Sequence, residues 1–243
     1  MIAWMKRKLR WVKRAFRKIT FRLDNFENIS RDELLCREYI EYALIDKSKR
    51  PRENLIKTMS KGCGVLEEIG VKYWLGRGTL LGFYRDNDFL PNDIDIDIDV
   101  YTDKDIYKII QKMPFEVLFV TNCRGHYMQL AFFDRETNII FDIFFYFESG
   151  DKWYNRNCFG YFWLPSNQFD KLGIMNFDGR NYPVPLDSEW YCRFWYGEDW
   201  KTPKKQSADW TIEYRNNCKG FIFEGVKNVT DLCYYRDDAE TRC

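Results

Sequence analysis

The sequence predicts a fold of the α/β (α+β) class, in which helices flank one mixed sheet. Two observations predict this class. From about residue 51 to 147, the spacing of apolar residues switches repeatedly between the helical and the strand period. Within that region, residues 93–101 alternate acidic with apolar side chains, which indicates a strand with one face on a core. The 243 residues are 45% hydrophobic and 19% aromatic, so the chain is able to bury a sizeable core.

Residues that are typical of helix N-termini mark the first two helices expected after the basic segment 1–23. Ser30 and Glu33 have the spacing of a capping box, which predicts a helix over residues 31–46. Pro51 is placed to open a second helix that runs to about residue 69, because proline is favoured in the first turn.

The remaining elements follow from periodicity and turn residues. They are a strand at 71–75, a tight loop at 76–78, a short helix at 79–84, the acidic strand at 93–101, a helix at 103–113 and strands at 115–120, 127–133 and 139–147. Beyond residue 150 the chain is aromatic-rich and is expected to be irregular. The exceptions are a hairpin at 176–185 and a helix at 186–196.

Residues 1–23 form a strongly basic segment. They contain nine Lys or Arg residues and no acid, which leaves 29 basic against 37 acidic residues in the rest of the chain. Apolar residues recur in steps of three and four, so we expect an amphipathic helix that lies on an anionic membrane surface. Packing on the body of the protein or on a partner chain is the alternative. The acidic remainder argues against nucleic acid as a partner.

The cysteine and histidine content excludes several kinds of site. None of the eight cysteines forms a CxxC pair, so a zinc site of the usual spacing is not expected. His126 is the only histidine, which excludes mechanisms that need two. We expect reduced, mostly buried thiols, with one or two disulfides as the alternative in a luminal protein.

The acidic strand is the strongest functional signal. Asp93, Asp95, Asp97 and Asp99 point to one face of the strand, because side chains alternate across a strand. Carboxylates so close together repel one another, and a divalent cation removes that repulsion. Ligand sets made only of oxygen select Mg²⁺, Mn²⁺ or Ca²⁺. A solvated acidic edge strand is the alternative interpretation.

Two further segments support a metal and phosphate site. Asp142 lies in the otherwise apolar run 139–145, where an unpaired carboxylate is costly, so it is a candidate ligand from a neighbouring strand. A hydrogen bond to backbone or to an arginine is the alternative. Upstream, residues 76–79 read Gly-Arg-Gly-Thr before a helix, where backbone amides can reach a phosphate. A glycine loop, a short helix and an Asp-x-Asp strand are typical of nucleotidyltransferase sites.

Five ordered motifs in the sequence resemble the LicD/fukutin family. They are Gly78-Thr79-Leu80-Leu81-Gly82-x-x-Arg85, Pro91-x-Asp93-x-Asp95-Ile96-Asp97, Phe141-Asp142-Ile143-Phe144, Phe177-Asp178-Gly179-x-x-Tyr182-Pro183-Val184-Pro185 and Tyr196-Gly197-x-x-Trp200-x-x-Pro203. The resemblance covers roughly residues 50–205. Two positions depart from the pattern, since Asn92 replaces a usual tryptophan and Asp99 a usual glycine. The change at position 92 puts the identity of the donor in doubt.

The resemblance implies a nucleotidyltransferase-like fold and a transferase activity. Members move a phospho-alcohol, such as phosphocholine or ribitol phosphate, from a CDP-linked donor such as CDP-choline to a sugar hydroxyl. We therefore expect a metal-dependent phosphotransferase that uses Mg²⁺ (or Mn²⁺) and modifies a cell-surface glycan or a lipid-linked glycan.

The resemblance also assigns roles to residues. By position, Asp95, Asp97 and Asp142 would be the catalytic metal ligands and Asp93 a supporting one. Gly78, Thr79 and Arg85 would bind the donor phosphates. For Arg85, fixing the acidic strand or forming a structural salt bridge are the alternatives. For His126 we expect a possible substrate contact, with an ordinary histidine at a strand end as the alternative.

Three parts are expected along the chain. They are a basic membrane-surface arm at 1–24, a catalytic domain at 25–205 and a C-terminal extension at 206–243. No apolar run has the roughly 18 residues of a transmembrane helix, and the N-terminus lacks the pattern of a signal peptide. We therefore expect a cytoplasmic location with peripheral attachment to a membrane. The lumen of the secretory pathway is the alternative.

Two rival functions remain open from the sequence. One is a GT-A-type glycosyltransferase that uses Asp95-Ile96-Asp97 as its Asp-x-Asp motif, although that class needs a nucleotide-binding βαβ unit well before the motif. The other is a non-catalytic protein that binds membranes or polyanions through residues 1–23.

Overall fold

The computed structural model describes residues 51–91, 93, 95–123, 126–157, 160–204 and 216–223. Backbone contacts divide the chain into the units Met1–Leu34 and Leu35–Cys243, and every described residue belongs to the second. The helices expected at 1–23 and 31–46 lie outside the described residues. Among the helices that the structure does describe, none is long and apolar enough to span a membrane.

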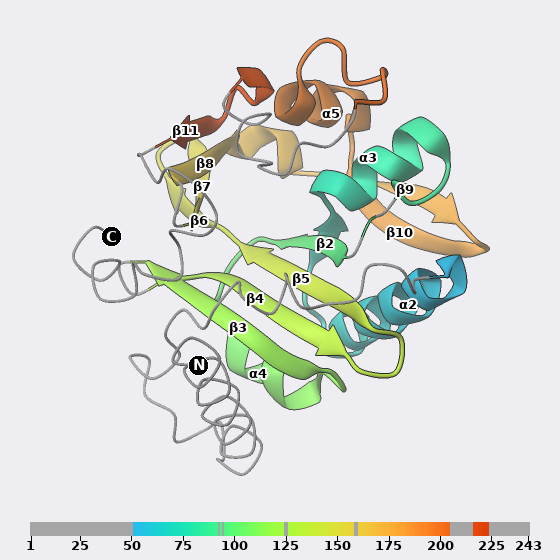
Figure 1. The fold of residues 1–243 in the computed structure, drawn as a ribbon. Helices are drawn as coiled ribbons and strands as arrows, with labels where there is room; N and C mark the ends of the chain where they lie inside the picture. Colours follow the sequence, from blue (N-terminus) through green and yellow to red (C-terminus); the bar gives the residue numbers. More distant parts are fainter. Residues whose placement is uncertain are drawn as a thin grey trace, which may run out of the picture. The chain divides into compact units, whose positions relative to one another are not determined.

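A mixed five-stranded sheet forms the centre of the described unit (Figure 1). Its strand order is β1 (Tyr73–Leu75), β2 (Asp95–Val100), β5 (Ile139–Phe145), β4 (His126–Asp134) and β3 (Glu116–Cys123). β2 and β5 are parallel, whereas the other neighbouring pairs are antiparallel. The predicted fold class, a mixed sheet flanked by helices, is therefore confirmed.

Helices cover both faces of this sheet. α2 (Arg52–Glu68) packs on the face formed by alternate apolar residues of β2 and β5. A methyl group added to Gly62 of α2 would lie 2.5 Å from the ring of Phe141, which shows how closely helix and sheet approach. α4 (Ile106–Lys112) follows β2 in the chain. The first residues of α3 (Arg77–Asp86) contact the opposite face of the sheet, where they meet Asp97 and Phe144.

The boundaries of α3 differ from the prediction. The loop expected at 76–78 is the first turn of the helix, with Gly76 as its N-cap. The helix then runs past residue 84 to Asp86, where Asn87 ends it in the left-handed conformation at φ 55°. The two glycines around Arg77 suggested a loop, but tertiary contacts of that turn hold it in the helix.

A second sheet lies in the region that we expected to be irregular, and that prediction was wrong. Its order is β11 (Phe221–Phe223), β8 (Gly160–Pro165), β7 (Lys152–Asn157) and β6 (Phe147–Ser149). Trp153 and Tyr154 point to opposite faces of β7, and both are packed. The ring of Trp153 lies 6.1 Å from that of Trp74 between centroids, and the ring of Tyr154 lies 5.7 Å from that of Phe147. Apolar residues on both faces leave no period-two pattern to read.

The predicted hairpin is confirmed. β9 (Leu172–Phe177) and β10 (Arg180–Pro185) pair across Asp178-Gly179, and both turn residues have positive φ, as tight hairpin turns require. Phe177 stacks on Phe83 of α3 at 3.7 Å, so the hairpin supports the helix that carries the candidate site. η4 (Ser166–Phe169) precedes the hairpin, and α5 (Ser188–Tyr196) follows it.

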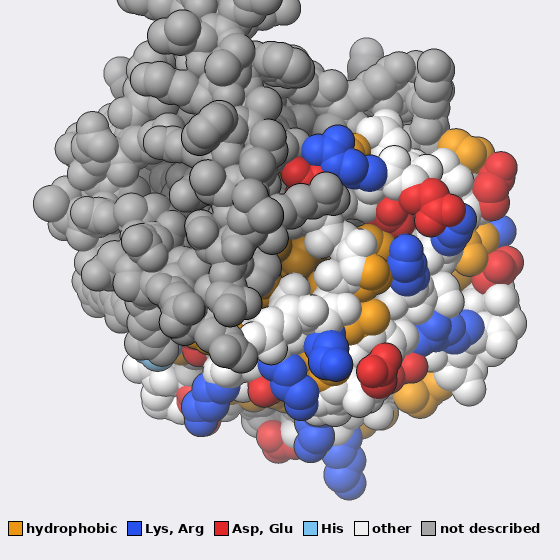
Figure 2. Space-filling view, turned by 90° about the horizontal axis from the view of Figure 1, so that it is seen from below, with side chains coloured by type: hydrophobic (Ala, Val, Ile, Leu, Met, Phe, Trp, Pro, Cys, Tyr) orange, Lys and Arg blue, Asp and Glu red, His pale blue; other side chains and the backbone are white. Residues whose placement is uncertain are grey.

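Basic and acidic side chains are interspersed on the described part of one face of the molecule (Figure 2). Ion pairs join Lys57 to Glu136 and Arg135 to Glu116. The exposed pair of Lys57 and Glu136 contributes only about 0–1 kcal/mol. The main consequence of both pairs is that opposite charges cancel locally over these described residues.

Candidate active site

Three aspartates from adjacent strands form a compact cluster. Asp97 of β2 and Asp142 of β5 are register partners in the parallel pairing, so their side chains lie on the same face. Asp95 lies two residues before Asp97 and shares that face. One carboxylate oxygen of each residue lies within 4.8 Å of the others. The structure thus brings together the three residues that the sequence predicts as metal ligands.

The cluster has an excess of negative charge. Burial raises the pKa of Asp97 well above its usual value, and the charges of Asp95 and Asp142 add to that rise. Arg77 opposes the rise without cancelling it. Asp142 is buried, with 1% of its surface exposed. A cation in contact with these oxygens would therefore stabilise the ionised form of the cluster.

The donor set fits a hard divalent cation. All three candidate ligands offer carboxylate oxygens, which suit Mg²⁺, Mn²⁺ and Ca²⁺. A cation about 2.0–2.6 Å from each ligand sets oxygens on opposite sides about 4–5 Å apart, close to the spacing observed here.

Glycine at position 78 lets the helix approach the acidic strand. A Cβ atom there would lie 3.2 Å from Oδ2 of Asp97 and 3.7 Å from Oδ2 of Asp93. Asp93 therefore lies beside the same glycine as Asp97, at the entrance to β2. Its role as a supporting ligand stays a prediction.

Gly78 and Thr79 bind the acidic strand directly. The Gly78 amide donates a hydrogen bond of 2.9 Å to Oδ2 of Asp97, and the Asp97 amide donates one of 2.8 Å to the hydroxyl of Thr79. These two bonds fix the start of α3 against the middle of β2. Contact of Gly78 and Thr79 with donor phosphates stays a prediction.

Arg85 lies in the last turn of α3 and pairs with its neighbour. Its Nε and Nη2 donate to the carboxylate of Asp86 at 2.8 and 2.6 Å, and this pairing raises the pKa of Arg85. The pair matches the structural salt bridge that we considered as an alternative. Phosphate binding by Arg85 stays a prediction.

The structure places His126 away from the aspartate cluster. It is the first residue of β4, half-exposed, and its ring stacks on Phe147 at 5.1 Å. The β4 partner of Asp142 is Ala131, five residues further on, so His126 lies roughly 17 Å away along the strand. The possible substrate contact of His126 would therefore be remote from the carboxylates.

Asp99 has surroundings unlike those of Asp97. It is fully buried, and the hydroxyls of Tyr191 and Tyr146 donate to its two oxygens at 2.8 and 3.1 Å. The guanidinium of Arg77 lies 3.5 Å from Oδ1. Burial raises the pKa of Asp99, while Arg77 and the two hydroxyls oppose that rise. Asp99 thus has a positive partner and two hydroxyl donors supplied by the protein itself.

The sequence alone does not identify Arg77, Tyr146 and Tyr191 as neighbours of the site. A fourth aspartate on the same strand face was the available signal, because a buried carboxylate needs a positive partner. Arg77 was the cation within the adjoining glycine-rich segment. No comparable signal marks Tyr191, which is 92 residues from Asp99 in the chain.

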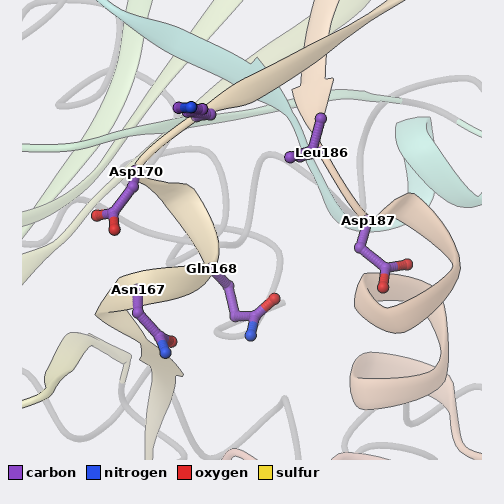
Figure 3. Close-up of a pocket in the computed structure, with 6 residues that line it drawn as sticks. Asn167, Gln168, Asp170, Leu186 and Asp187 are labelled. Carbon is purple, nitrogen blue, oxygen red and sulfur yellow. The ribbon is translucent and has the colours of Figure 1, made fainter.

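Two surface hollows lie apart from the aspartate cluster. One, of about 290 Å³, is lined by Asn167, Gln168, Asp170, Lys171, Leu186 and Asp187, and lies between η4 and the start of α5 (Figure 3). The second, of about 490 Å³, shares Leu186 and Asp187 and extends to Tyr84. None of the three clustered aspartates lines either hollow. The chemistry therefore assigns the candidate site to the aspartates rather than to the hollows.

A mixed sheet that presents aspartates on adjacent parallel strands, beside the N-terminus of a helix, is typical of the nucleotidyltransferase class. Residues 70–187 match the family model described as LicD/FKTN/FKRP, nucleotidyltransferase domain. This range contains the whole central sheet, α3 and the β9–β10 hairpin. Residues 70–187 of the chain are thus homologous to the nucleotidyltransferase domain of LicD/FKTN/FKRP proteins.

Curated relatives agree with this assignment. The ribitol-5-phosphate transferase FKTN of Mus musculus is 26% identical over 190 residues, which cover 71% of this chain and 38% of that protein. FKTN of Homo sapiens is 24% identical over 173 residues, or 65% of this chain and 35% of that protein. The ribitol 5-phosphate transferase FKRP of Homo sapiens is 50% identical over 68 residues, or 28% of this chain and 14% of that protein.

The chain spans little more than a third of the length of the FKTN relatives. Among solved structures, the antibiotic-resistance factor ANT(2'')-Ia aligns with a TM-score of 0.41 at 11% identity, over 79% of this chain and 90% of that one.

Proposed function

We propose that the protein is a metal-dependent phosphotransferase that moves a phospho-alcohol from a CDP-linked donor to a hydroxyl of a glycan. The observation that supports this proposal is the cluster of Asp95, Asp97 and Asp142 inside a LicD-family domain. Relatives of that domain are named ribitol-5-phosphate transferases, so ribitol phosphate is the first phospho-alcohol to test.

The proposed reaction is a displacement at phosphorus. An acceptor hydroxyl oxygen forms the new bond to the phosphorus that bears the alcohol, and the bond from that phosphorus to CMP breaks. The hydroxyl proton passes to a carboxylate, either Asp97 or Asp142. A bound Mg²⁺ or Mn²⁺ would supply charge stabilisation for the departing CMP phosphate.

The residues of the chain would position the reacting groups. Asp95, Asp97 and Asp142 would hold the cation, with Asp93 in support. The first turn of α3 keeps the Asp97 carboxylate in place through the Gly78 amide. A carboxylate fixed in this way is already oriented before the donor binds, which lowers the cost of reaching the reactive geometry.

The rival GT-A glycosyltransferase function receives less support. Among the described residues that precede β2, the chain forms α2, β1 and α3, and β1 is antiparallel to β2. A nucleotide-binding βαβ unit requires a parallel pair of strands joined by a helix, and these described elements form none.

A donor screen tests the proposal. The purified protein is incubated with Mg²⁺, a glycan acceptor and CDP-ribitol, CDP-glycerol or CDP-choline, and CMP release is measured. We expect release with one CDP-alcohol and none with a UDP-sugar. Turnover of the UDP-sugar alone would favour the glycosyltransferase. The absence of turnover with every donor, together with membrane binding, would favour the non-catalytic binder.

A matched pair of variants distinguishes the loss of a metal ligand from a nonspecific loss of activity. Asp97→Asn keeps the size of the side chain and removes a ligand, so we expect turnover to fall by more than about 100-fold. Asp170→Asn changes an exposed acid in the hollow of Figure 3 and should leave turnover within about twofold, because surface substitutions have small effects. An Asp97→Asn protein that retains full turnover would rule out the scheme.

A further inference from the structure

The backbone at Arg77 has an unusual conformation. Its φ is 45°, in the left-handed region that residues other than glycine rarely adopt. Such a conformation persists only where surrounding contacts hold it, and it is enriched at functional sites. Arg77 is also the first residue of α3, directly between the two glycines that approach the acidic strand. The contacts that hold it are therefore informative.

The side chain of Arg77 is buried beside the sheet. Only 6% of the residue is exposed, and its guanidinium lies 3.6 Å from the ring centroid of Phe144. Nε faces Asp99 at 3.5 Å, and Nη2 donates to the hydroxyl of Tyr146 at 3.4 Å. A buried cation with a carboxylate partner and a second acceptor has its desolvation compensated locally. These contacts anchor the side chain.

Tyr191 of α5 anchors the backbone of the same turn. Its hydroxyl donates to Oδ2 of Asp99 at 2.8 Å and accepts the Arg77 amide at 3.1 Å. A Cβ atom at Gly76 would lie 2.3 Å from Oδ2 of Asp99 and 3.0 Å from the Tyr191 hydroxyl. The first turn of α3, β2 and α5 therefore meet at Gly76, where any side chain would clash with Asp99 and Tyr191.

The next amide of the turn reaches the candidate metal site. Gly78 donates to Oδ2 of Asp97 at 2.9 Å, and Thr79 accepts the Asp97 amide. The Arg77 amide that bonds to Tyr191 and the Gly78 amide that bonds to Asp97 flank the Arg77 Cα, so a shift of the Arg77 backbone out of its held conformation would also redirect the Gly78 N–H. The position of the turn is thus coupled to the orientation of the Asp97 carboxylate.

We propose that Arg77, Asp99 and Tyr191 form a positioning network that holds the first turn of α3 and thereby orients Asp97 for cation binding. None of the three touches the substrate in this role, since they act through the Gly78 amide. The expected effect of this network on cation affinity rests on the proposed function. The expected effect on the stability of the turn does not.

Two tyrosines provide a matched comparison. Tyr191 and Tyr146 are both buried, and each donates one hydroxyl hydrogen bond to Asp99. Only Tyr191 also accepts a backbone amide of the turn. Tyr191→Phe and Tyr146→Phe should therefore lower stability by similar amounts, whereas only Tyr191→Phe should release the turn.

The first readout is hydrogen–deuterium exchange, measured by mass spectrometry without added metal. Amide exchange in a peptide that contains residues 76–80 should accelerate by about tenfold in Tyr191→Phe and by less than about twofold in Tyr146→Phe. A peptide from the middle of α2 is the internal reference. Equal acceleration in both variants, or none in Tyr191→Phe, would overturn the network. If Tyr191→Phe does not fold, Asp99→Asn replaces it with the same expected acceleration.

The second readout is the dissociation constant for Mn²⁺, measured by calorimetry on the 243-residue chain. It should rise by about five- to tenfold in Tyr191→Phe and remain within about twofold in Tyr146→Phe. In turnover assays, Tyr191→Phe should lower kcat more than it raises KM for the donor. A wild-type protein that binds no Mn²⁺ would overturn the metal centre of the proposed function. The exchange result would then still decide the positioning network.

Discussion

Asp97 and Asp99 lie two residues apart on β2 and face the same side of the sheet, but their neighbours differ. Asp99 is surrounded by Arg77 and two tyrosine hydroxyls. Asp97 is surrounded by the carboxylates of Asp95 and Asp142. The same residue type on one strand face therefore forms a structural ion pair at one position and, at the other, belongs to the acidic cluster where we propose that a cation binds.

Asp97→Asn should increase the stability of the metal-free protein while it removes activity. The raised pKa of Asp97 means that the folded state binds its proton more tightly than the unfolded state. The stability of the wild type is then greatest at low pH and decreases as the pH rises through the folded pKa. Asparagine does not ionise, so the variant does not lose stability when the pH rises through the pKa of residue 97. At neutral pH we therefore expect its Tm in EDTA to be higher by about 2–4 °C.

Thermal unfolding in EDTA at pH 5 and pH 7.5 checks this expectation. The wild type should lose Tm between the two values, and the variant should lose less. A variant that is less stable than the wild type at pH 7.5 would contradict the interpretation of the aspartates as a cluster of mutually repelling carboxylates.

Cys63 and Cys192 predict a second pH effect, at the alkaline end. Burial raises the pKa of each thiol to about 12, above the value of the unfolded chain. Stability contributed by the protonated thiols is complete below about pH 8.5 and is lost as the pH rises toward the folded pKa. The double variant Cys63→Ala/Cys192→Ala should show a smaller decrease in its urea midpoint between pH 8 and pH 10.5. An unchanged pH slope would exclude these thiols as the cause.

At the scale of elements, the sequence predicted the central sheet better than its surroundings. β2 and β5 have clear patterns. In β2, aspartates alternate with buried apolar residues, and β5 is apolar apart from Asp142. β7 has no such pattern, and its buried Asn155 donates to the backbone of Met128 and Phe145 in the other sheet. A contact between two sheets is not encoded within the window of a single strand, so this second sheet was missed.

The candidate site was predictable only in part. Asp95 and Asp97 were identified by alternation, and Asp142 by its position in an apolar run, because a buried carboxylate is an exception within its own segment. Arg77 is indicated only indirectly, by the need of Asp99 for a positive partner, and Tyr191 carries no local signal. An arginine between glycines reads as an exposed loop residue, and an aromatic residue in an amphipathic helix reads as core. Their roles depend on contacts between distant elements.

Glycines of α3 and α2 give a prediction at this scale. A Cβ atom at Gly82 would lie 2.6 Å from the carbonyl oxygen of Asp88 and 2.9 Å from the amide of Leu90, so the returning backbone would have to shift. Gly82→Ala should therefore destabilise the protein by about 1–3 kcal/mol. Gly64→Ala meets only the flexible end of Arg180 and should stabilise by up to about 1 kcal/mol. Urea unfolding measures both, and the same sign for the two variants would contradict the packing argument.

At the scale of the whole molecule, the chain combines a region that matches a family model with a basic N-terminal segment. The domain match covers residues 70–187, and the segment 1–23 lies outside both that match and the described residues. Residues 216–223 fall in the expected C-terminal extension, yet β11 pairs with β8 of the second sheet. That part of the extension therefore belongs structurally to the described unit.

Membrane association is predicted to depend on residues 1–23. Deletion of this segment should reduce sedimentation with phosphatidylserine vesicles to the level seen with phosphatidylcholine vesicles, because nine basic residues interact with the anionic surface at about 1 kcal/mol each. Turnover of soluble substrates should remain within about twofold of the wild type, as expected for a change remote from the site. Full binding of the deletion variant to anionic vesicles would locate the membrane contact elsewhere.

The bond between Tyr191 and Asp99 also has a consequence for protein synthesis. The two residues are 92 positions apart, so the ribosome has completed β2 well before it adds Tyr191. At about 5–20 residues per second, this interval lasts roughly 5–18 s. Asp142 is added 49 residues before Tyr191, so for roughly 2.5–10 s of that interval the nascent chain contains all three clustered aspartates but lacks the hydroxyl that fixes the turn beside them. A ligand-ready geometry is therefore reached only late in translation, and chains that end before α5 are expected to be preferred substrates for proteases.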